Sequence, residues 1–522
     1  MTTGKGQNVN EISSAVALVP GEVELALLRR IHDGEVSLIL DLSAREAMKQ
    51  SQAVVQEILA TGQVAYGINT GFGKLAQTII PPDRLAELQR NLVLSHSAGT
   101  GEPLSANVVR LVLATKAVSL ARGHSGARPE LVDALLALFN AGLMPRIPCK
   151  GSVGASGDLA PLAHMACVLI GEGEVTTKQG EVISGAQAMH LIGMTPFVLA
   201  PKEGLALLNG TQVSTSLALT GLFGAENVFC AGLTSGALSL EAIQGSVKPL
   251  DARVQAARGQ KGQIAVAQAL RAMLDGSAIV ASHSNCARVQ DPYSIRCIPQ
   301  VMGACLDNLV HAAQVLQIEA NAASDNPLVF TDNGDVISGG NFHAEPVAFA
   351  ADIIALAVSE IGAISERRMA LLLDSGLSGL PPFLVRDGGV NSGFMIAQVT
   401  AAALASENKS LAHPASVDSL PTSANQEDHV SMATFAARRL GDMVNNTAVV
   451  VGIEAMAAVQ GIELKRGPKS SEILEQEFAR IRDRVAFIEQ DRFMATDVES
   501  MRKWALRSEW SAPLMAVLPS RS

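Results

Sequence analysis

The composition of the chain excludes several classes of protein before any motif is considered. Its 522 residues carry a net charge of −10 without a basic cluster, which argues against nucleic acid or an anionic membrane as a partner. Hydrophobic residues make up 48% of the chain and charged residues 17%, yet only 3% are aromatic. Such an Ala- and Leu-rich composition favours closely packed helices, and the low charge fraction points to surface hidden in subunit contacts.

The cysteines and the N-terminal residues predict the cellular compartment of the protein. The cysteines show no C-x-x-C spacing, which is typical of reduced intracellular thiols: Cys149, Cys167, Cys230, Cys286, Cys297 and Cys305. The N-terminal stretch MTTGKGQNVNEISS is polar and lacks the apolar core of a signal peptide. We therefore expect a cytoplasmic protein.

The first part of the chain is predicted to alternate helices with glycine-rich loops. Helix-like spacing runs from Val23 to Ala60, with Gly62 as a stop. The stretch AYGINTGFGKLA then breaks the periodicity and is a predicted loop. Further helices are expected over residues 81–103, where two prolines start the segment and glycines end it, and over residues 105–123 and 129–142.

Long helical patterns dominate beyond residue 200. Helices are expected over residues 203–245, 262–280, 298–323, 343–374, 395–412, 428–460 and 470–490, the last with Ser471 as its N-cap. Residues 326–340 predict a hairpin. The apolar run from Gly204 to Leu240 contains one charge, Glu226, but polar residues interrupt it, so a buried bundle helix fits better than a membrane span.

These patterns predict a mainly α fold in two parts. Residues 1–200 form a loop-rich N-terminal part, and residues 201–522 form a central bundle of long helices with C-terminal helices behind it. The segment after about residue 460 gives little functional information.

Several short motifs match a known pattern only in part. GFGKLA fits a dinucleotide-binding pattern but follows no strand, and the P-loop pattern fails because Leu75 follows Lys74. GASGD lacks the second glycine of a nucleophile elbow, since Asp158 stands there. His343 and Glu345 suggest a metal pair, but no third ligand lies at a suitable spacing, so one polar turn is the simpler interpretation. We therefore expect no metal site.

The stretch KGSVGASGDLAPLAHM places three very small residues, Ala155, Ser156 and Gly157, in a row. If the amide nitrogen of Gly157 attacks the carbonyl of Ala155, the backbone closes into a five-membered ring, and only residues with little side chain permit this approach. Loss of water and of the Ser156 hydroxyl then gives 4-methylideneimidazol-5-one, a strong electrophile. Taken alone, Ala-Ser-Gly is a common flexible turn.

Motifs spread along the chain favour the cyclised form. GSVGASGDLAPLAH resembles the cofactor-forming signature of the aromatic amino acid ammonia-lyase family, in which Ala-Ser-Gly cyclises autocatalytically. Other segments agree with this family: YGINTGFG, LLNGTQ, QDPYSIRC, SDNPLVF, GGNFHAEP, LPPFLV, NSGFMIAQVTAAALASE and SANQEDHVSM. The resemblance weakens after about residue 460. It implies a homotetramer with a central helical bundle, active sites shared between subunits, an amino acid substrate and no external cofactor.

Within this family the motifs are most similar to those of members that convert L-histidine to trans-urocanate and ammonia, the first step of histidine degradation. Ser95 and His96 stand where relatives acting on tyrosine or phenylalanine often have His-Leu or Phe-Leu, and Glu427 stands where the histidine-specific members have an essential glutamate. Polar partners for both imidazole nitrogens would discriminate against a phenyl ring. Taken alone, His96 would be an ordinary helix-end histidine and Glu427 a solvated acid.

The resemblance also implies roles for the remaining motif residues. The chain's two tyrosines both lie in motifs: Tyr66 is the expected base for the β-proton, and Tyr293 stabilises the adduct or shares the proton transfer. Arg296 is expected to clamp the substrate carboxylate. Asn209 and Gln290 are expected to hold the ring oxygen and the substrate. Phe342 and Met395 are expected to line the pocket, although a position in the ordinary hydrophobic core explains these two residues equally well.

Two alternatives stay open at this point. One is another activity of the same family, a phenylalanine or tyrosine ammonia-lyase or an aminomutase, and a mutase differs only in how long the site stays closed. The other is a serine hydrolase using Ser156, with His164 as the base, although no third member is evident. Intact mass separates the second alternative, because cyclisation removes two water molecules.

Overall fold

The computed structural model of the chain describes residues 15–283, 289–465 and 467–521. The polar N-terminal stretch and Cys286 therefore lie outside the described residues. The described cysteines are free thiols: Cys149, Cys167, Cys230, Cys297 and Cys305.

The chain forms two compact units, each assembled from separate segments. The first unit comprises Met1–Leu217, Gln317–Glu345 and Asp418–Phe435, and the second comprises Ala218–Leu316, Pro346–Val417 and Ala436–Ser522. The first unit thus holds two later segments besides the N-terminal part suggested by the sequence. Backbone hydrogen bonds attach them: Ala344 N donates to the Gly154 carbonyl at 3.2 Å, and Met432 N donates to the Val153 carbonyl at 2.9 Å.

The first unit is mainly helical, with a few short strands. Its helices are α1 (Leu25–Asp33), α2 (Leu42–Thr61), α3 (Leu85–His96), α4 (Ala106–Ala121), α5 (Pro129–Ala141), α6 (Leu159–Leu169), α7 (Gly185–Leu191) and α8 (Glu203–Leu208). Gly62 ends α2 with a left-handed φ of 73°, as predicted. Its strands are β1 (Val16–Leu18), β2 (Leu38–Leu40), β3 (Thr100–Pro103), β4 (Met144–Pro145), β5 (Pro148–Lys150), β6 (Glu174–Thr176), β7 (Val182–Ser184), β8 (Leu328–Phe330) and β9 (Asp335–Ile337).

The strands pair in small sheets. β1 and β2 are parallel, whereas β3 pairs with β5, β4 with β6, and β6 with β7 in antiparallel order. β8 and β9 form the hairpin predicted for residues 326–340, with Val329 opposite Val336. β2 interrupts the helical pattern expected between Val23 and Ala60, because Gly34 ends α1 in a left-handed conformation and the Asn140 side chain bonds both backbone groups of Leu38.

The helix predicted over residues 203–245 is two helices, α8 and α9 (Gln212–Ala242). Between them Gly210 has a φ of 130°, which L side chains rarely adopt. Its carbonyl oxygen accepts a hydrogen bond of 2.7 Å from Asp158 N. The break therefore places Asn209 and Gly210 against the Ala-Ser-Gly loop.

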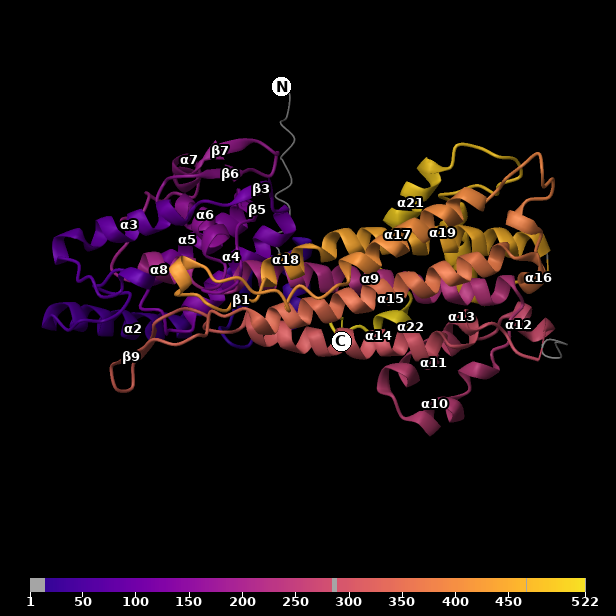
Figure 1. Cartoon of the computed structure of the whole chain (residues 1–522), viewed down its shortest axis with the longest axis horizontal. Helices are drawn as coiled ribbons and strands as arrows, with labels where there is room; N and C mark the ends of the chain where they lie inside the picture. Colours follow the sequence, from indigo (N-terminus) through magenta and orange to yellow (C-terminus); the bar gives the residue numbers. More distant parts are fainter. Residues whose placement is uncertain (1–14, 284–288, 466, 522) are drawn as a thin grey trace, which may run out of the picture. The chain divides into compact units, whose positions relative to one another are not determined.

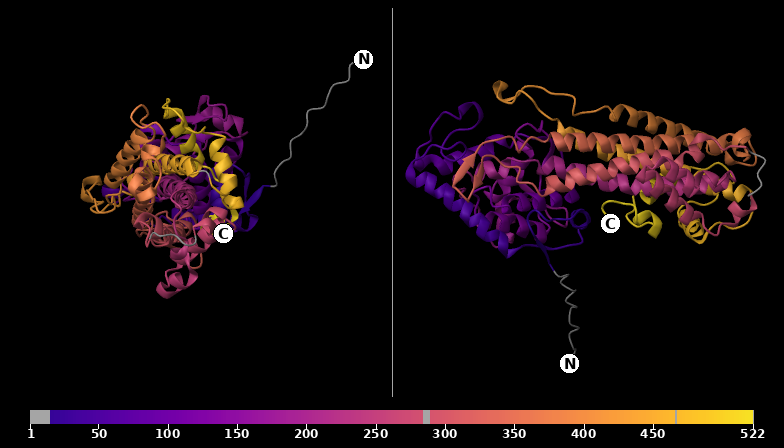
Figure 2. Two further views of the ribbon diagram at one scale, coloured as in Figure 1. Left: turned by 90° about the vertical axis from the view of Figure 1, so that its right-hand side faces the viewer. Right: turned by 90° about the horizontal axis from the view of Figure 1, so that it is seen from below.

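The remaining helices include the long ones of the second unit. They are α10 (Ala252–Arg258), α11 (Lys261–Leu274), α12 (Ala278–Ser282), α13 (Tyr293–Arg296), α14 (Ile298–Ala320), α15 (Glu345–Leu373), α16 (Ser375–Ser378), α17 (Met395–Leu411), α18 (Ala433–Arg438), α19 (Leu440–Lys465), α20 (Glu472–Arg482), α21 (Ala495–Ala505) and α22 (Ala512–Met515). In the second unit α19 contacts α17, α20 and α21, and the long helices lie side by side (Figures 1 and 2). The helices predicted over residues 298–323, 343–374 and 395–412 are confirmed.

Four other predicted helices need correction. The helix over 81–103 covers only Leu85–His96, because residues 100–103 form β3, which pairs with β5. The helix over 262–280 is divided into α11 and α12, because Gly276 has a φ of 76° and the Ser277 side chain caps Val280 N. The helix over 428–460 begins only at Ala433, because Met432 has a φ of 55° and its N–H bonds the Val153 carbonyl instead of a helical one, and it is divided into α18 and α19. The helix over 470–490 has Ser471 as its N-cap, as predicted, but ends at Arg482. Beyond Arg482 the Gln460 side chain forms hydrogen bonds with both the N–H and the carbonyl of Ile488. These backbone groups therefore have partners without being part of a helix.

Three helical segments are long and apolar enough to cross a membrane by length and composition: Gln212–Ala242, Glu345–Leu373 and Ala433–Lys465. The most apolar window of each is 83%, 67% and 78% buried within the protein. Glu226, the one charged residue between Gly204 and Leu240, accepts a hydrogen bond of 2.9 Å from Ser520 N. The apolar run from Gly204 to Leu240 is thus mostly buried, as the sequence predicts.

Candidate active site

The Ala155–Gly157 tripeptide lies just before α6, against the break between α8 and α9. Gly157 has a φ of 72°, and a Cβ atom added to it would lie 2.2 Å from the Gly210 carbonyl oxygen. Only glycine fits this contact without a shift of the backbone. Ala155 is 4% exposed, so the tripeptide enters the interior instead of standing out as a flexible surface turn.

Asp158 anchors the end of this loop. Its carboxylate is fully buried and accepts hydrogen bonds from Ser152 Oγ at 3.0 Å, Thr434 Oγ1 at 2.7 Å, and Ser214 N and Oγ at 2.7 and 2.9 Å. Burial raises the pKa of Asp158, although these hydrogen bonds act in the opposite direction. One side chain thus joins the loop to the first turn of α9 and to α18.

A cavity of about 720 Å³ opens beside the loop within the first unit. Six of the residues predicted from the sequence line it: Tyr66, His96, Ser156, Asn209, Phe342 and Glu427. The other lining residues include an apolar wall from α3, α6 and α8, namely Leu88, Leu92, Leu159, Leu205 and Leu208. The structure therefore gathers residues from widely separated motifs around Ser156.

Glu427 is held by a tight turn that its own side chain stabilises. Its Oε2 accepts hydrogen bonds from Thr422 Oγ1 at 2.7 Å and from Ser423 Oγ at 2.9 Å, while its Oε1 accepts one from Ser156 Oγ at 2.5 Å. Burial raises the pKa of Glu427, but these hydrogen bonds and the nearby His96 outweigh it, so the net shift of the pKa is downward.

The Ser156 hydroxyl thus contacts a carboxylate and not an imidazole. His164, the base considered for a hydrolase, is engaged elsewhere, because its Nε2 accepts a hydrogen bond of 3.1 Å from Gly99 N. The described geometry gives Ser156 no histidine partner of the kind that a serine nucleophile needs.

His96 ends α3 and presents its ring to the cavity. Its Nδ1 lies 2.8 Å from the Leu92 carbonyl oxygen and 3.1 Å from Ser95 Oγ. A carbonyl only accepts, so Nδ1 is the donor of this contact, and in the tautomer protonated at Nδ1 alone Nε2 is left as an acceptor. The side chain can therefore receive a hydrogen bond from a donor in the cavity.

Tyr66 lies on the predicted loop, which a second contact holds in place. Gly73 N donates to the Tyr66 hydroxyl at 3.5 Å, and the Tyr66 and Phe72 rings meet edge to face with centroids 6.5 Å apart. Lys74 Nζ donates to the Ala424 carbonyl at 3.1 Å. The loop with Tyr66 is thereby tied to the turn with Glu427.

The contacts of the Asn209 side chain indicate whether a ring formed from the backbone of residues 155–157 fits at this position. Its Nδ2 donates to the Ser156 carbonyl at 2.8 Å, and its buried Oδ1 has no hydrogen-bond partner among the described residues. A donor already faces a carbonyl of the tripeptide, and an unused buried acceptor lies beside it. Together with the left-handed Gly157, these features fit a ring made from Ala155, Ser156 and Gly157.

Lys116 is a residue of the site that the motifs do not contain. It is fully buried in α4 and donates to the Asn209 carbonyl at 2.7 Å. Burial lowers the pKa of Lys116 to about 7, Lys202 lowers it further, and Asp325 and Asp158 act against them. Its one signal in the sequence is a lone lysine inside the apolar run of residues 106–121.

The other predicted site residues lie in the second unit, and none of them is among the described residues that line the cavity: Gln290, Tyr293, Arg296 and Met395. The Tyr293 side chain is 71% exposed, and the Arg296 guanidinium lies 4.3 Å from the centroid of its ring. Met395 begins α17 and is 37% exposed. Gln290, Tyr293 and Met395 are thus exposed to solvent, whereas Arg296 is only partly exposed.

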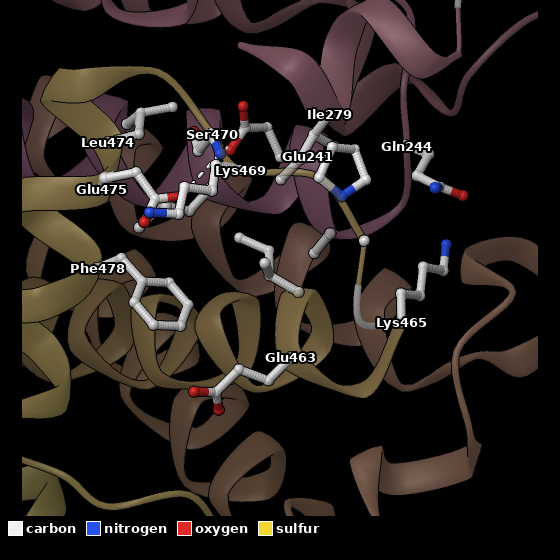
Figure 3. A pocket seen from close by; sticks show the side chains of 15 residues that line it. Glu241, Gln244, Ile279, Glu463, Lys465, Lys469, Ser470, Leu474, Glu475 and Phe478 are labelled. Carbon is white, nitrogen blue, oxygen red and sulfur yellow. Dashed lines mark hydrogen bonds between the residues drawn. The ribbon is translucent and has the colours of Figure 1, made fainter.

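A smaller pocket of about 240 Å³ lies in the second unit (Figure 3). Its central carboxylate, Glu241, accepts hydrogen bonds of 2.6 Å from both Ser277 Oγ and Ser470 Oγ. Figure 3 shows Ser470 and Glu475 beside it, where Ser470 N donates to Glu475 at 2.7 Å. None of the predicted site residues lines this pocket, and its polar groups hold the segment before α20 in place.

Comparisons with known proteins show which family the chain belongs to. The family model for aromatic amino acid lyases matches residues 23–483. The histidine ammonia-lyase of Paracidovorax citrulli (strain AAC00-1) is 74% identical over 505 residues, which cover 97% of this chain and 98% of that protein. The crystal structure of histidine ammonia-lyase from Trypanosoma cruzi has a TM-score of 0.86 and 41% identity, with 94% of this chain and 93% of that chain covered. A tyrosine aminomutase from Streptomyces globisporus has a TM-score of 0.89 and 34% identity, over 95% and 97% of the two chains. The chain therefore belongs to the aromatic amino acid lyase family.

Proposed function

We propose that the chain is a histidine ammonia-lyase, which removes ammonia from L-histidine and releases trans-urocanate. The observation that carries this choice is the meeting of Ser156, Glu427 and His96 in one cavity. Glu427 keeps a lowered pKa and supplies an anion for a ring N–H, and the His96 ring supplies a second polar partner in the same cavity. Two polar partners suit an imidazole side chain, whereas a phenyl ring would leave both without a partner.

We propose that Ala155, Ser156 and Gly157 close into 4-methylideneimidazol-5-one. This ring supplies an electrophilic carbon, which no ordinary side chain offers. Asp158 holds the end of the tripeptide through its buried carboxylate, and Gly210 fixes Gly157 in its left-handed conformation. Asn209 donates to the carbonyl of residue 156.

The remaining roles are assigned to side chains that the cavity holds. Tyr66 is the proposed base for the β-proton of the substrate, because its hydroxyl is held by Gly73 N on the wall of the cavity. Phe342 and the leucines of the wall exclude water from the reacting centre. His96 and Glu427 orient the imidazole, and before the ring forms Glu427 accepts a hydrogen bond from the Ser156 hydroxyl.

We propose that Gln290, Tyr293, Arg296 and Met395 complete the site from a neighbouring subunit of a homotetramer. Support comes from apolar side chains that stay exposed on the long helices. On α15 Phe349 and Leu356, two turns apart on one face, are 54% and 56% exposed, and on α17 Ile396 and Val399 are 65% and 53% exposed. Such exposed apolar faces are typical of subunit interfaces.

Mixed assemblies test this sharing. Chains with Ser156→Ala and chains with Arg296→Ala are each expected to be inactive, and their co-assembly is expected to restore part of the activity. Restoration follows because some sites then combine an intact tripeptide from one chain with an intact Arg296 from another. No restoration in a tetramer that contains both variants would place Arg296 in the same chain's site.

We further propose a cytoplasmic enzyme without nucleic acid or membrane partners. The described cysteines are free thiols, and the long apolar helices are largely buried within the protein.

The activity itself is tested with purified full-length protein. Incubation with L-histidine is expected to raise the near-ultraviolet absorbance and to release an equal amount of ammonia, whereas L-phenylalanine and L-tyrosine give neither. Intact mass is expected to lie two water molecules below the sequence mass, and the Ser156→Ala variant is the control. A β-amino acid product would instead indicate an aminomutase, and an unreduced mass with no product would reject the ring.

A further inference from the structure

Three potential metal ligands meet in the first unit, outside the set of residues that line the cavity. They are His343, Glu345 and His429, and one ligand atom of each lies within 4.8 Å of the others. His343 and Glu345 are close in sequence, but His429 comes from the segment that follows Glu427. The fold thus supplies the third ligand that the sequence alone does not offer.

The side chains are arranged as a small open site. The His343 and His429 rings are stacked, with centroids 5.7 Å apart and an interplanar angle of 8°. His429 Nε2 lies 3.9 Å from Glu345 Oε2. Glu345 is the first residue of α15, so its position is set by a rigid element. The His429 side chain is 69% exposed, which leaves the group accessible to an ion from solvent.

Both histidine rings also have partners that fix their orientation. His343 Nε2 lies 3.3 Å from the His429 carbonyl oxygen, and His429 Nδ1 lies 3.4 Å from Ser419 Oγ. For His429 this leaves Nε2, the nitrogen nearest to Glu345, as the ligand atom. Metal-binding histidines usually have such a contact at the nitrogen that does not bind the metal.

We propose that His343, Glu345 and His429 bind a divalent transition-metal ion, with zinc as the best match. Two imidazoles and one carboxylate form a ligand set that zinc prefers, with the fourth position left for water. Zinc–ligand distances of about 2.0–2.2 Å put ligand atoms roughly 3.4 Å apart, so side-chain rotations that shorten the present distances by about 1 Å complete the site. The ion would join the segment with Phe342 to the segment with Glu427.

The test measures binding and stability without substrate. Full-length protein freed of metal with a chelator is titrated with Co²⁺, whose visible absorption reports a tetrahedral site, and then with Zn²⁺ in competition. We expect one ion per chain and a rise of the melting temperature of a few degrees. His343→Asn and His429→Asn are each expected to weaken Co²⁺ binding by more than about tenfold.

A matched control is His190→Asn, which changes an exposed histidine on α7 of the same unit and is expected to bind as the unchanged protein does. Unchanged Co²⁺ binding in both His343→Asn and His429→Asn would overturn the proposal. So would loss of binding in His96→Asn with His429→Asn unaffected, because the ion would then lie in the cavity. Since no turnover is measured, failure of the proposed lyase activity leaves this test intact.

Discussion

In the second unit the buried carboxylate of Glu454 is surrounded by donors, whereas in the first unit the buried amine of Lys116 faces backbone and amide oxygens instead of a carboxylate. Glu454 accepts two hydrogen bonds from Arg368, at 2.5 and 2.8 Å, and both side chains are fully buried. Three hydroxyls complete its environment: Ser235, Ser239 and Ser365. Lys116 Nζ donates to the Asn209 carbonyl at 2.7 Å and approaches Gln212 Oε1 at 3.5 Å.

The Glu454–Arg368 pair is a buried charge of the scaffold, whereas Lys116 is a buried charge at the site. A paired charge whose carboxylate oxygens all accept hydrogen bonds fixes the helices around it. Burial without a carboxylate in hydrogen-bond contact lowers the pKa of an amine, and it lowers the pKa of Lys116 to about 7. This second kind of environment is typical of functional sites, and here it lies directly behind Asn209.

The largest effect is expected from breaking the paired charge. Glu454→Ala leaves Arg368 buried without its carboxylate, which should lower the free energy of unfolding by about 3–5 kcal/mol. Urea denaturation measures this loss. The double variant Glu454→Leu with Arg368→Met should recover most of it, because no buried charge remains. A single variant as stable as the unchanged protein would contradict the description of this pair as structural.

The next largest effect is expected from removing the negative charge of Glu427 in the cavity. Glu427→Gln keeps the shape but removes the anion, so turnover of L-histidine should fall about 100-fold. The lowered pKa of Glu427 means that its carboxylate stays ionised well into the acidic range, and its contribution is lost as the pH falls through that pKa.

The control for this change is Thr422→Val, which removes one hydrogen bond that lowers the pKa of Glu427. The pKa of Glu427 then rises, and the acidic limb of the rate profile should move to higher pH with a similar plateau. Identical limbs in both proteins would show that Glu427 does not control the profile.

A smaller effect is expected from Lys116→Met, which removes the unpaired amine. In the unfolded chain a lysine binds its proton up to about pH 10.4, whereas Lys116 in the folded protein loses it near pH 7. The unfolded state binds more protons between these values, so stability should rise with pH across this window. Lys116→Met should lose this slope, so its advantage in stability is largest below pH 7 and shrinks toward pH 10. Equal slopes would contradict the lowered pKa.

The smallest effect is expected at an exposed ion pair of the second unit. Arg502 donates to Glu499 at 2.8 Å, and this hydrogen bond lowers the pKa of Glu499 to about 2. Solvent screens such a pair, so Glu499→Ala should leave the melting temperature unchanged within measurement error. A clear fall would mean that exposed pairs matter as much here as the buried one.

The helices were predictable where their apolar period is unbroken, and their breaks were not. Gly221, Gly224 and Gly232 continue α9, whereas Gly210 separates it from α8. The sequence treats these glycines alike, because what distinguishes Gly210 is its contact with Asp158, more than fifty positions earlier. Helix propensity is a local property, and this break is set by tertiary structure.

The residues of the site likewise fall into those that the sequence predicts and those that only the fold reveals. Six motif residues were predicted and line one cavity, because each motif is recognisable by itself. Lys116 was missed because its partner is a backbone carbonyl 93 positions away, to which any residue type could contribute. His429, the third residue of the group with His343 and Glu345, was missed because it is distant in sequence. Only the folded chain places its segment beside His343 and Glu345.

The order of synthesis gives the discontinuous first unit a further consequence. Ser431 Oγ and Met432 N bond the loop at Gly154 and Val153, and Thr434 Oγ1 bonds Asp158 from 276 positions later. At roughly 5–20 residues per second, the ribosome makes these partners on the order of 14–55 s after the tripeptide. A nascent chain therefore carries the tripeptide for that time without its full set of contacts, and a transcript truncated before residue 431 yields a chain that never acquires them.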